Sequence, residues 1–158
     1  MKLHAHLYLV LAPLLIAAGP ANAHGGDHEA SAYGHPGDAS KVSRTIKIDM
    51  KEYEFSIPTL SVNKDETIRF VITNVGKMKH EMTIGSEEEQ LAHRKEMEAM
   101  ANMHHDESTH AMPGNAIHVS PGETREIIWQ FTKAGKIKFA CNYPGHADLG
   151  MEGNISIE

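Results

Sequence analysis

Between residue 44 and the C-terminus, short runs of alternating apolar and polar residues are separated by turn residues. In the run 45–50, Ile46, Ile48 and Met50 share one face, because successive side chains of a β-strand point to opposite sides. Similar runs occur at 53–55, 60–62, 67–75, 116–119, 124–131 and 135–141, the last of which opens a hairpin-like pair at the C-terminus. Seven or eight short strands with turns between them predict an all-β fold, a Greek-key β-sandwich.

Residues 86–115 interrupt this alternation and predict one helical insertion in the sandwich. Ser86 and Glu89 have the spacing of a capping box, and the residues that follow, through about His104, are good helix formers. At 100° per residue, four side chains with sulfur or imidazole groups fall on one narrow stripe of this helix. They are His93, Met97, Met100 and His104.

The first 23 residues predict a cleaved secretory signal. Lys2 supplies a positive start, an apolar run covers 7–18, and Ala21-Asn22-Ala23 is a small-x-small cleavage site. The apolar run is shorter than the roughly 20 residues that a membrane-spanning helix needs. We therefore expect export to the periplasm and no stable membrane insertion after cleavage.

Residues 24–43 are rich in small and polar residues and carry His24, His28 and His35. Such a segment has little to bury, so we expect a flexible arm that precedes a single folded domain at 44–158. Two interpretations of its histidines remain open: they capture Cu(II), or they only titrate near neutral pH.

The chain carries 15 Lys and Arg against 21 Asp and Glu, a net charge of −6. It has no basic cluster of the kind that binds nucleic acid, so we expect no nucleic-acid partner. A monomer is expected.

The last eighteen residues hold the strongest candidate chemistry, because they contain the only cysteine of the chain. Cys141, His146 and Met151 follow one another at intervals of five residues, with proline and glycine between them to bend the backbone. A thiolate, an imidazole and a thioether are ligands that select copper over hard cations. The best candidate for a fourth ligand is His80, which closes a run that reads as a strand.

The segments CNYPGHADLGMEG and NVGKMKHEMTIG resemble the cupredoxins, the small blue-copper proteins typified by plastocyanin, azurin, auracyanin and rusticyanin. The resemblance implies a β-sandwich with one type 1 copper ion. His80, Cys141 and His146 would bind it in a plane, and Met151 would be a long axial ligand. It also implies that the edge of His146 is the route for electrons. One departure concerns Glu81, since many cupredoxins have Asn after the first histidine, and hydrogen bonds around the ligands tune the metal.

The helical stripe has two interpretations. In one, Met97 and Met100 pack the helix onto the sandwich, because Met fills irregular gaps. In the other, His93, Met97, Met100 and His104 are secondary ligands for a further copper ion, preferably Cu(I).

Two functions follow from these patterns. The first is electron transfer by a copper ion that cycles between Cu(I) and Cu(II). The second is copper tolerance, in which the protein sequesters or buffers copper, since the ten histidines and eight methionines after residue 23 exceed what one ion needs. The expected partner is a redox protein or a copper-handling protein. The whole chain resembles the periplasmic cupredoxins associated with copper resistance, which carry similar Met- and His-rich additions. We expect no enzymatic activity, because copper ligation would leave Cys141 without a free thiolate.

Overall fold

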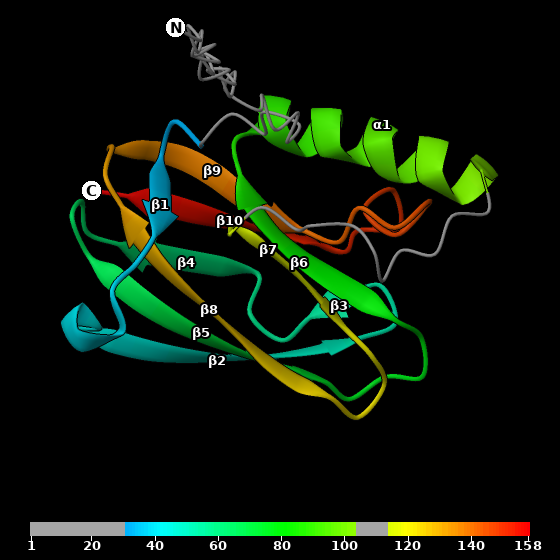
Figure 1. Cartoon of the computed structure of the whole chain (residues 1–158), viewed down its shortest axis with the longest axis horizontal. Coiled ribbons are helices and arrows are strands. Elements are labelled where there is room, and N and C mark those ends of the chain that lie inside the picture. The colour runs from blue at the N-terminus through cyan, green and yellow to red at the C-terminus, as the bar shows by residue number, and fades with distance from the viewer. Residues whose placement is uncertain (1–30, 104–113) are drawn as a thin grey trace, which may run out of the picture.

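The computed structural model describes residues 31–103 and 114–158 of the chain, and two five-stranded sheets face each other in it (Figure 1). The first sheet has the order β1-β8-β5-β2-β3 and the second the order β4-β10-β9-β6-β7. The strands are β1 (Gly34–Pro36), β2 (Arg44–Lys51), β3 (Glu54–Phe55), β4 (Thr59–Val62), β5 (Thr67–Asn74), β6 (His80–Gly85), β7 (Ala116–Val119), β8 (Thr124–Phe131), β9 (Gly135–Ala140) and β10 (Glu152–Ile157). The predicted all-β sandwich is confirmed.

Both sheets are mixed, since β2 pairs with β5 in parallel, and β4 with β10, while the other pairs are antiparallel. The described part has ten strands rather than the seven or eight predicted. The excess comes from β1, which lies in the predicted arm, and from β6, which a turn at 75–79 separates from β5.

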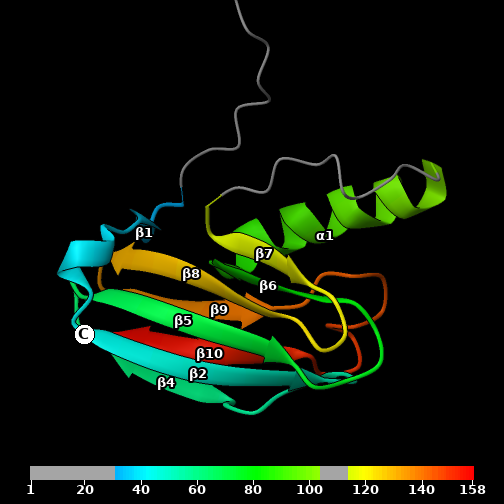
Figure 2. The same ribbon diagram turned by 60° about the horizontal axis from the view of Figure 1, so that its bottom comes forward.

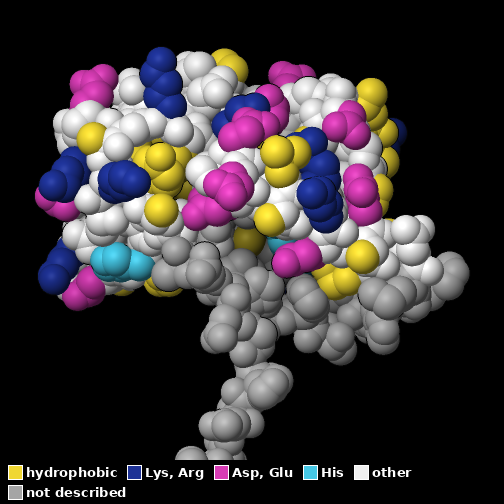
Figure 3. Space-filling model, turned by 90° about the horizontal axis from the view of Figure 1, so that it is seen from above, with side chains coloured by type: hydrophobic (Ala, Val, Ile, Leu, Met, Phe, Trp, Pro, Cys, Tyr) yellow, Lys and Arg dark blue, Asp and Glu magenta, His cyan; other side chains and the backbone are white. Residues whose placement is uncertain are grey.

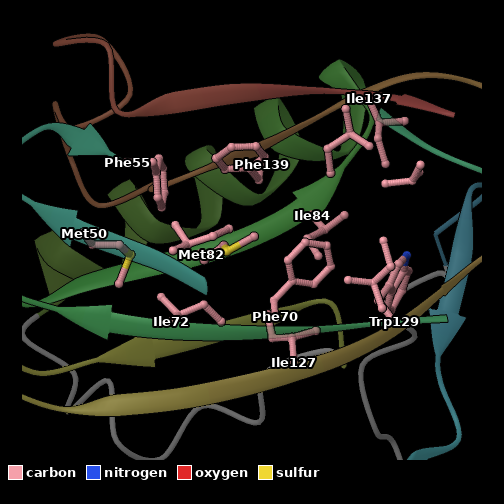
Figure 4. Close-up of a cluster of buried hydrophobic side chains, with 14 of the residues drawn as sticks. Met50, Phe55, Phe70, Ile72, Met82, Ile84, Ile127, Trp129, Ile137 and Phe139 are labelled. Atoms are coloured by element: carbon pink, nitrogen blue, oxygen red, sulfur yellow. The ribbon is translucent and has the colours of Figure 1, made fainter. Parts of the chain in front are cut away.

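The core fills the space between the sheets, and Figure 4 shows its side chains pointing toward one another from both layers. The alternation read from the sequence decides which residues enter it: Ile48 and Met50 of β2 are fully buried. Phe55 and Phe139 meet edge to face across the layers, with ring centroids 5.0 Å apart. Aromatic rings prefer this arrangement, which adds to the free energy of burial.

The expectation of a flexible arm is wrong for its last part, where β1 pairs with the edge of β8. The sequence around β1 reads as a loop because it contains Gly34 and Pro36. Both suit this position: an edge strand tolerates proline, and a Cβ on Gly34 would lie only 2.4 Å from Nε1 of Trp129. A short 3-10 helix, Ala39–Lys41, follows. Residues 24–30, with His24 and His28, lie outside the described residues.

One helix, α1 (Glu87–Met103), follows β6 and lies against β6 and β9 (Figures 1 and 2). The predicted capping box starts it: the backbone N–H of Ser86 donates to the carboxylate of Glu89, and the N–H of Glu89 donates to Oγ of Ser86 at 3.2 Å. The helix runs beside the loop that joins β9 to β10, as Figure 1 shows. In the described ranges, no helix has the length and apolar character needed to cross a membrane.

Candidate metal centre

The four predicted ligands lie at one end of the sandwich, where β6 begins and the loop between β9 and β10 runs. His80 is the first residue of β6, and not the last residue of the preceding run, because the turn at 75–79 reverses the chain before it. Cys141 directly follows β9, and His146 and Met151 belong to the loop. The fold therefore brings His80 to residues more than 60 positions away in the sequence.

The ligand atoms of His80, Cys141 and His146 form a tight triangle. Nδ1 of His146 lies 3.3 Å from Nδ1 of His80 and 3.3 Å from Sγ of Cys141, and Sγ lies 3.9 Å from Nδ1 of His80. A metal with bonds of about 2.0 Å to nitrogen and 2.3 Å to sulfur, in a plane at about 120°, needs separations of about 3.5 Å between nitrogens and 3.7 Å from nitrogen to sulfur. The triangle fits such an ion.

Hydrogen bonds within the loop hold its three predicted ligands together. The N–H of Cys141 donates to the carbonyl oxygen of Met151 at 3.0 Å, and the N–H of Met151 donates to that of His146 at 3.1 Å. Gly145 and Gly150 have φ values of 82° and 95°, in the left-handed region that favours glycine. The bends predicted from the sequence are thus present, and Met151 is fully buried on this closed loop.

Two tyrosines flank the imidazole of His146. The ring of Tyr53 meets it edge to face, with centroids 5.2 Å apart, and that of Tyr143 lies at 5.7 Å. Tyr53 has a φ of 62°, which is uncommon for a large side chain. His146 is half-buried between these rings, whereas His80 and Cys141 are fully buried.

Sequence comparison identifies the kind of protein that carries this site. Residues 42–158 match the family of copper binding proteins described as the plastocyanin/azurin family. The chain belongs to this family, the cupredoxins. Its sequence is 43% identical over 140 residues to the copper-resistant cuproprotein CopI of Rubrivivax gelatinosus, covering 86% of this chain and 81% of that protein. It is 33% identical over 174 residues to CopI of Pseudomonas aeruginosa, covering 95% and 93%.

Solved structures agree on the cupredoxin fold. Auracyanin B superposes with a TM-score of 0.63 at 16% identity, over 82% of this chain and 96% of auracyanin B. At that identity the likeness shows the fold alone. The predicted cupredoxin family, its copper cofactor and its kinship with copper-resistance proteins are therefore confirmed.

The electrostatics of the cupredoxin site favour neutral groups until a metal binds. Burial raises the pKa of the Cys141 thiol to about 12. Burial also lowers the pKa of His80 and of His146, and the neighbouring His146 lowers that of His80 further. A copper ion bound by Cys141 would displace the proton of the thiol, so copper binding would release a proton.

A buried polar cluster behind the ligands contains residues that sequence reasoning did not assign to the site. Glu81 is fully buried, as are Asn142 and, nearly so, Gln90. The N–H of Glu81 donates to Sγ of Cys141 at 3.4 Å, and its carboxylate accepts the N–H of Asn142 at 2.9 Å. The only sequence signal was the position of Glu81 next to His80.

Three members of the helical stripe, His93, Met97 and Met100, lie within the described residues. Nε2 of His93 lies 3.3 Å from the carboxylate of Glu81, Met97 is 2% exposed, and Met100 is half-buried. Among residues 31–103 and 114–158, His80, Cys141 and His146 are the one group of His, Cys, Asp or Glu side chains close enough to share an ion. His104 lies outside the described residues. The packing interpretation fits Met97, and His93 has a partner that the sequence did not reveal.

Proposed function

We propose that this cupredoxin binds one type 1 copper ion and transfers electrons in the periplasm, in a copper-tolerance context. The observation that carries the proposal is the tight triangle of His80, Cys141 and His146, with sides of 3.3, 3.3 and 3.9 Å. Bound copper supplies a one-electron couple there. The protein supplies fixed ligands on a rigid sandwich, which limits rearrangement between oxidation states.

Each ligand has a distinct role in this proposal. The thiolate of Cys141 provides the strong equatorial bond, the imidazoles of His80 and His146 complete the plane, and the thioether of Met151 is the weak axial ligand. His146 is the least buried of the four. Two exposed side chains lie near His146: Tyr53 in the turn between β2 and β3, and Leu149 in the loop between β9 and β10. Their exposure suits contact with a redox partner at the end of the sandwich that carries the ligands.

A second candidate function is copper sequestration or buffering, which the names of the CopI relatives favour. In this function the type 1 site acts together with additional Met and His ligands in the arm and the insertion. The two functions share localisation in the periplasm, a redox or copper-handling protein as partner, a monomeric state and no nucleic-acid partner. Figure 3 shows acidic and basic side chains interspersed on one face, which suits a protein partner rather than a polyanion.

We propose no enzymatic role for Cys141. A nucleophilic cysteine needs a lowered pKa, whereas burial raises the pKa of this thiol to about 12.

A Cu(II) titration of the mature protein, with visible absorption and electron paramagnetic resonance, tests the proposal. We expect an intense thiolate-to-copper band that saturates at one equivalent and is absent in Cys141→Ser. Replacing residues 104–113 by a Gly/Ser linker, which spares the packed helix, separates the two functions. Loss of copper tolerance with an unchanged band favours sequestration, and full tolerance favours electron transfer. If Cys141→Ser binds copper as the wild type does and no band forms, the type 1 assignment is wrong.

A further inference from the structure

A buried carboxylate stands directly behind the copper ligands. Glu81 follows His80 on β6 and is fully buried. Its N–H donates to Sγ of Cys141 at 3.4 Å, and Oε1 of its carboxylate accepts the N–H of Asn142 at 2.9 Å. One residue therefore contacts both the thiol and the backbone that immediately follows it.

A buried carboxylate needs partners, because removing an unpaired charge from water is strongly unfavourable. The hydroxyl of Thr83 donates to it at 3.4 Å, and the imidazole of His118 on β7 lies 3.7 Å away. The third partner is Nε2 of His93, at 3.3 Å from both carboxylate oxygens. His93 is the only one of these partners that comes from α1.

The same face of α1 makes further contacts with the segment that carries the ligands. Nε2 of Gln90 donates to the carbonyl oxygen of Thr83 at 2.8 Å, and its Oε1 accepts from Nδ2 of Asn142 at 2.8 Å. Arg94 forms an ion pair at 3.4 Å with Asp148, which lies in the loop between β9 and β10. Gln90, His93 and Arg94 are three and four positions apart, so they lie on one side of the helix.

From these contacts we infer that α1 is a positioning element of the copper site, and that His93 acts on the copper through Glu81. The inference rests on the proposed type 1 site. The carboxylate of Glu81 orients the backbone at Cys141 and places negative charge next to the thiolate. His93 holds this carboxylate in place from the helix and offsets its charge. His93, which the sequence places on a candidate copper-binding stripe, thus serves the main site.

The two residues act on the reduction potential in opposite directions. Negative charge near the metal stabilises Cu(II) more than Cu(I), because Cu(II) carries the larger charge. Glu81→Gln keeps the shape and an acceptor but removes the charge, so the reduction potential rises. His93→Gln keeps a donor to Glu81 but removes the imidazole. Burial lowers the pKa of this imidazole, but the carboxylates of Glu81 and Glu96 raise it, and the net shift is upward. The carboxylate is then less compensated, and the reduction potential falls.

The experiment compares wild type, Glu81→Gln, His93→Gln and a control, Lys95→Gln, which removes the positive charge of an exposed residue on the same helix. The readouts are the reduction potential, the thiolate-to-copper absorption band, and the urea denaturation of the copper-free proteins. For a one-electron couple, a tenfold change in the ratio of Cu(II) to Cu(I) affinity corresponds to a shift of about 59 mV. We expect a rise in the reduction potential for Glu81→Gln, a fall for His93→Gln and no shift for Lys95→Gln.

Structural damage alone would shift the reduction potential of Glu81→Gln and of His93→Gln in the same direction and weaken the absorption band of both variants. That result, or an unchanged potential in a folded His93→Gln protein, overturns the inference. If Glu81→Gln does not fold, the comparison of His93→Gln with Lys95→Gln still tests the inference. A missing band in the wild type overturns the proposed type 1 site. A normal wild-type band with equal potentials in all variants overturns only the role of α1.

Discussion

Met97 offers a direct test of whether the helical stripe packs or binds metal. Its side chain is 2% exposed, on α1. Truncating a buried Met to Ala removes its apolar contacts and leaves a cavity, which typically destabilises a protein by about 2–4 kcal/mol. For a domain of this size, that loss lowers Tm by roughly 6–16 °C. We expect Met97→Ala to show this loss in the copper-free protein, where no metal adds to the stability.

Met97→Leu separates packing from ligation, because Leu has a similar volume and no sulfur. A volume-conserving exchange in a core changes the free energy of unfolding by less than about 1.5 kcal/mol. We therefore expect near wild-type stability and an unchanged number of Cu(I) equivalents in a competition titration. Leu91→Ala is the matched control on the same helix: Leu91 is 44% exposed, so its truncation changes stability by no more than about 0.5 kcal/mol.

The packing argument is refuted by one pattern of results from urea denaturation followed by circular dichroism. In that pattern, copper-free Met97→Ala is as stable as the wild type, and Met97→Leu binds one Cu(I) equivalent fewer. The thioether would then be a ligand rather than a core group, and the secondary copper site on the stripe would be supported.

Three further predictions concern the pH dependence, the first strand and the turn beside the loop histidine. The pKa of His93 is raised from 6.5, so its stabilising effect is present below that pH and is lost as the pH rises through the folded-state pKa. In copper-free protein, the stability difference between wild type and His93→Gln should be larger at pH 6 than at pH 8.5, and an equal difference would contradict this sign. Gly34→Val should lower the free energy of unfolding in urea by about 2 kcal/mol or more, because the new Cβ would clash with Trp129. Wild-type stability of this variant would show that β1 is not packed against Trp129. Tyr53 and Asp65 both have positive φ (62° and 67°), so glycine would relieve backbone strain at either position. Tyr53→Gly also loses the aromatic contact with His146, so this variant should be less stable than Asp65→Gly by about 0.5–1.5 kcal/mol.

Local patterns in the sequence were sufficient for much of the fold. Alternation located most strands, because the period of two is a property of each strand alone. The start of α1 followed from Ser86 and Glu89, whose reciprocal hydrogen bonds span three residues. The spacing of Cys141, His146 and Met151 predicted a loop whose own backbone hydrogen bonds close it. Each of these features depends on residues that are close in the chain.

Only the tertiary structure decided the partners that are distant in the sequence. The sequence did not predict the pairing of β1 with β8, because Gly34 and Pro36 are typical of a loop. They suit a strand only beside the ring of Trp129 and at the edge of a sheet, and both conditions depend on the tertiary structure. The proximity of His80 to the loop was inferred, but its place at the start of β6 was not.

The contacts of the helical stripe were also decided in three dimensions. Periodicity shows that His93 and Met97 share a face of α1, but not whether that face meets copper, apolar side chains or a carboxylate. The answer depends on Glu81, which is twelve residues from His93 in the chain and 3.3 Å from it in space. The sequence by itself thus predicted the candidate metal ligands and determined the sandwich. The structure alone revealed the polar contacts between α1 and the loop that joins β9 to β10. Contacts between residues distant in the chain leave no periodic pattern in the sequence.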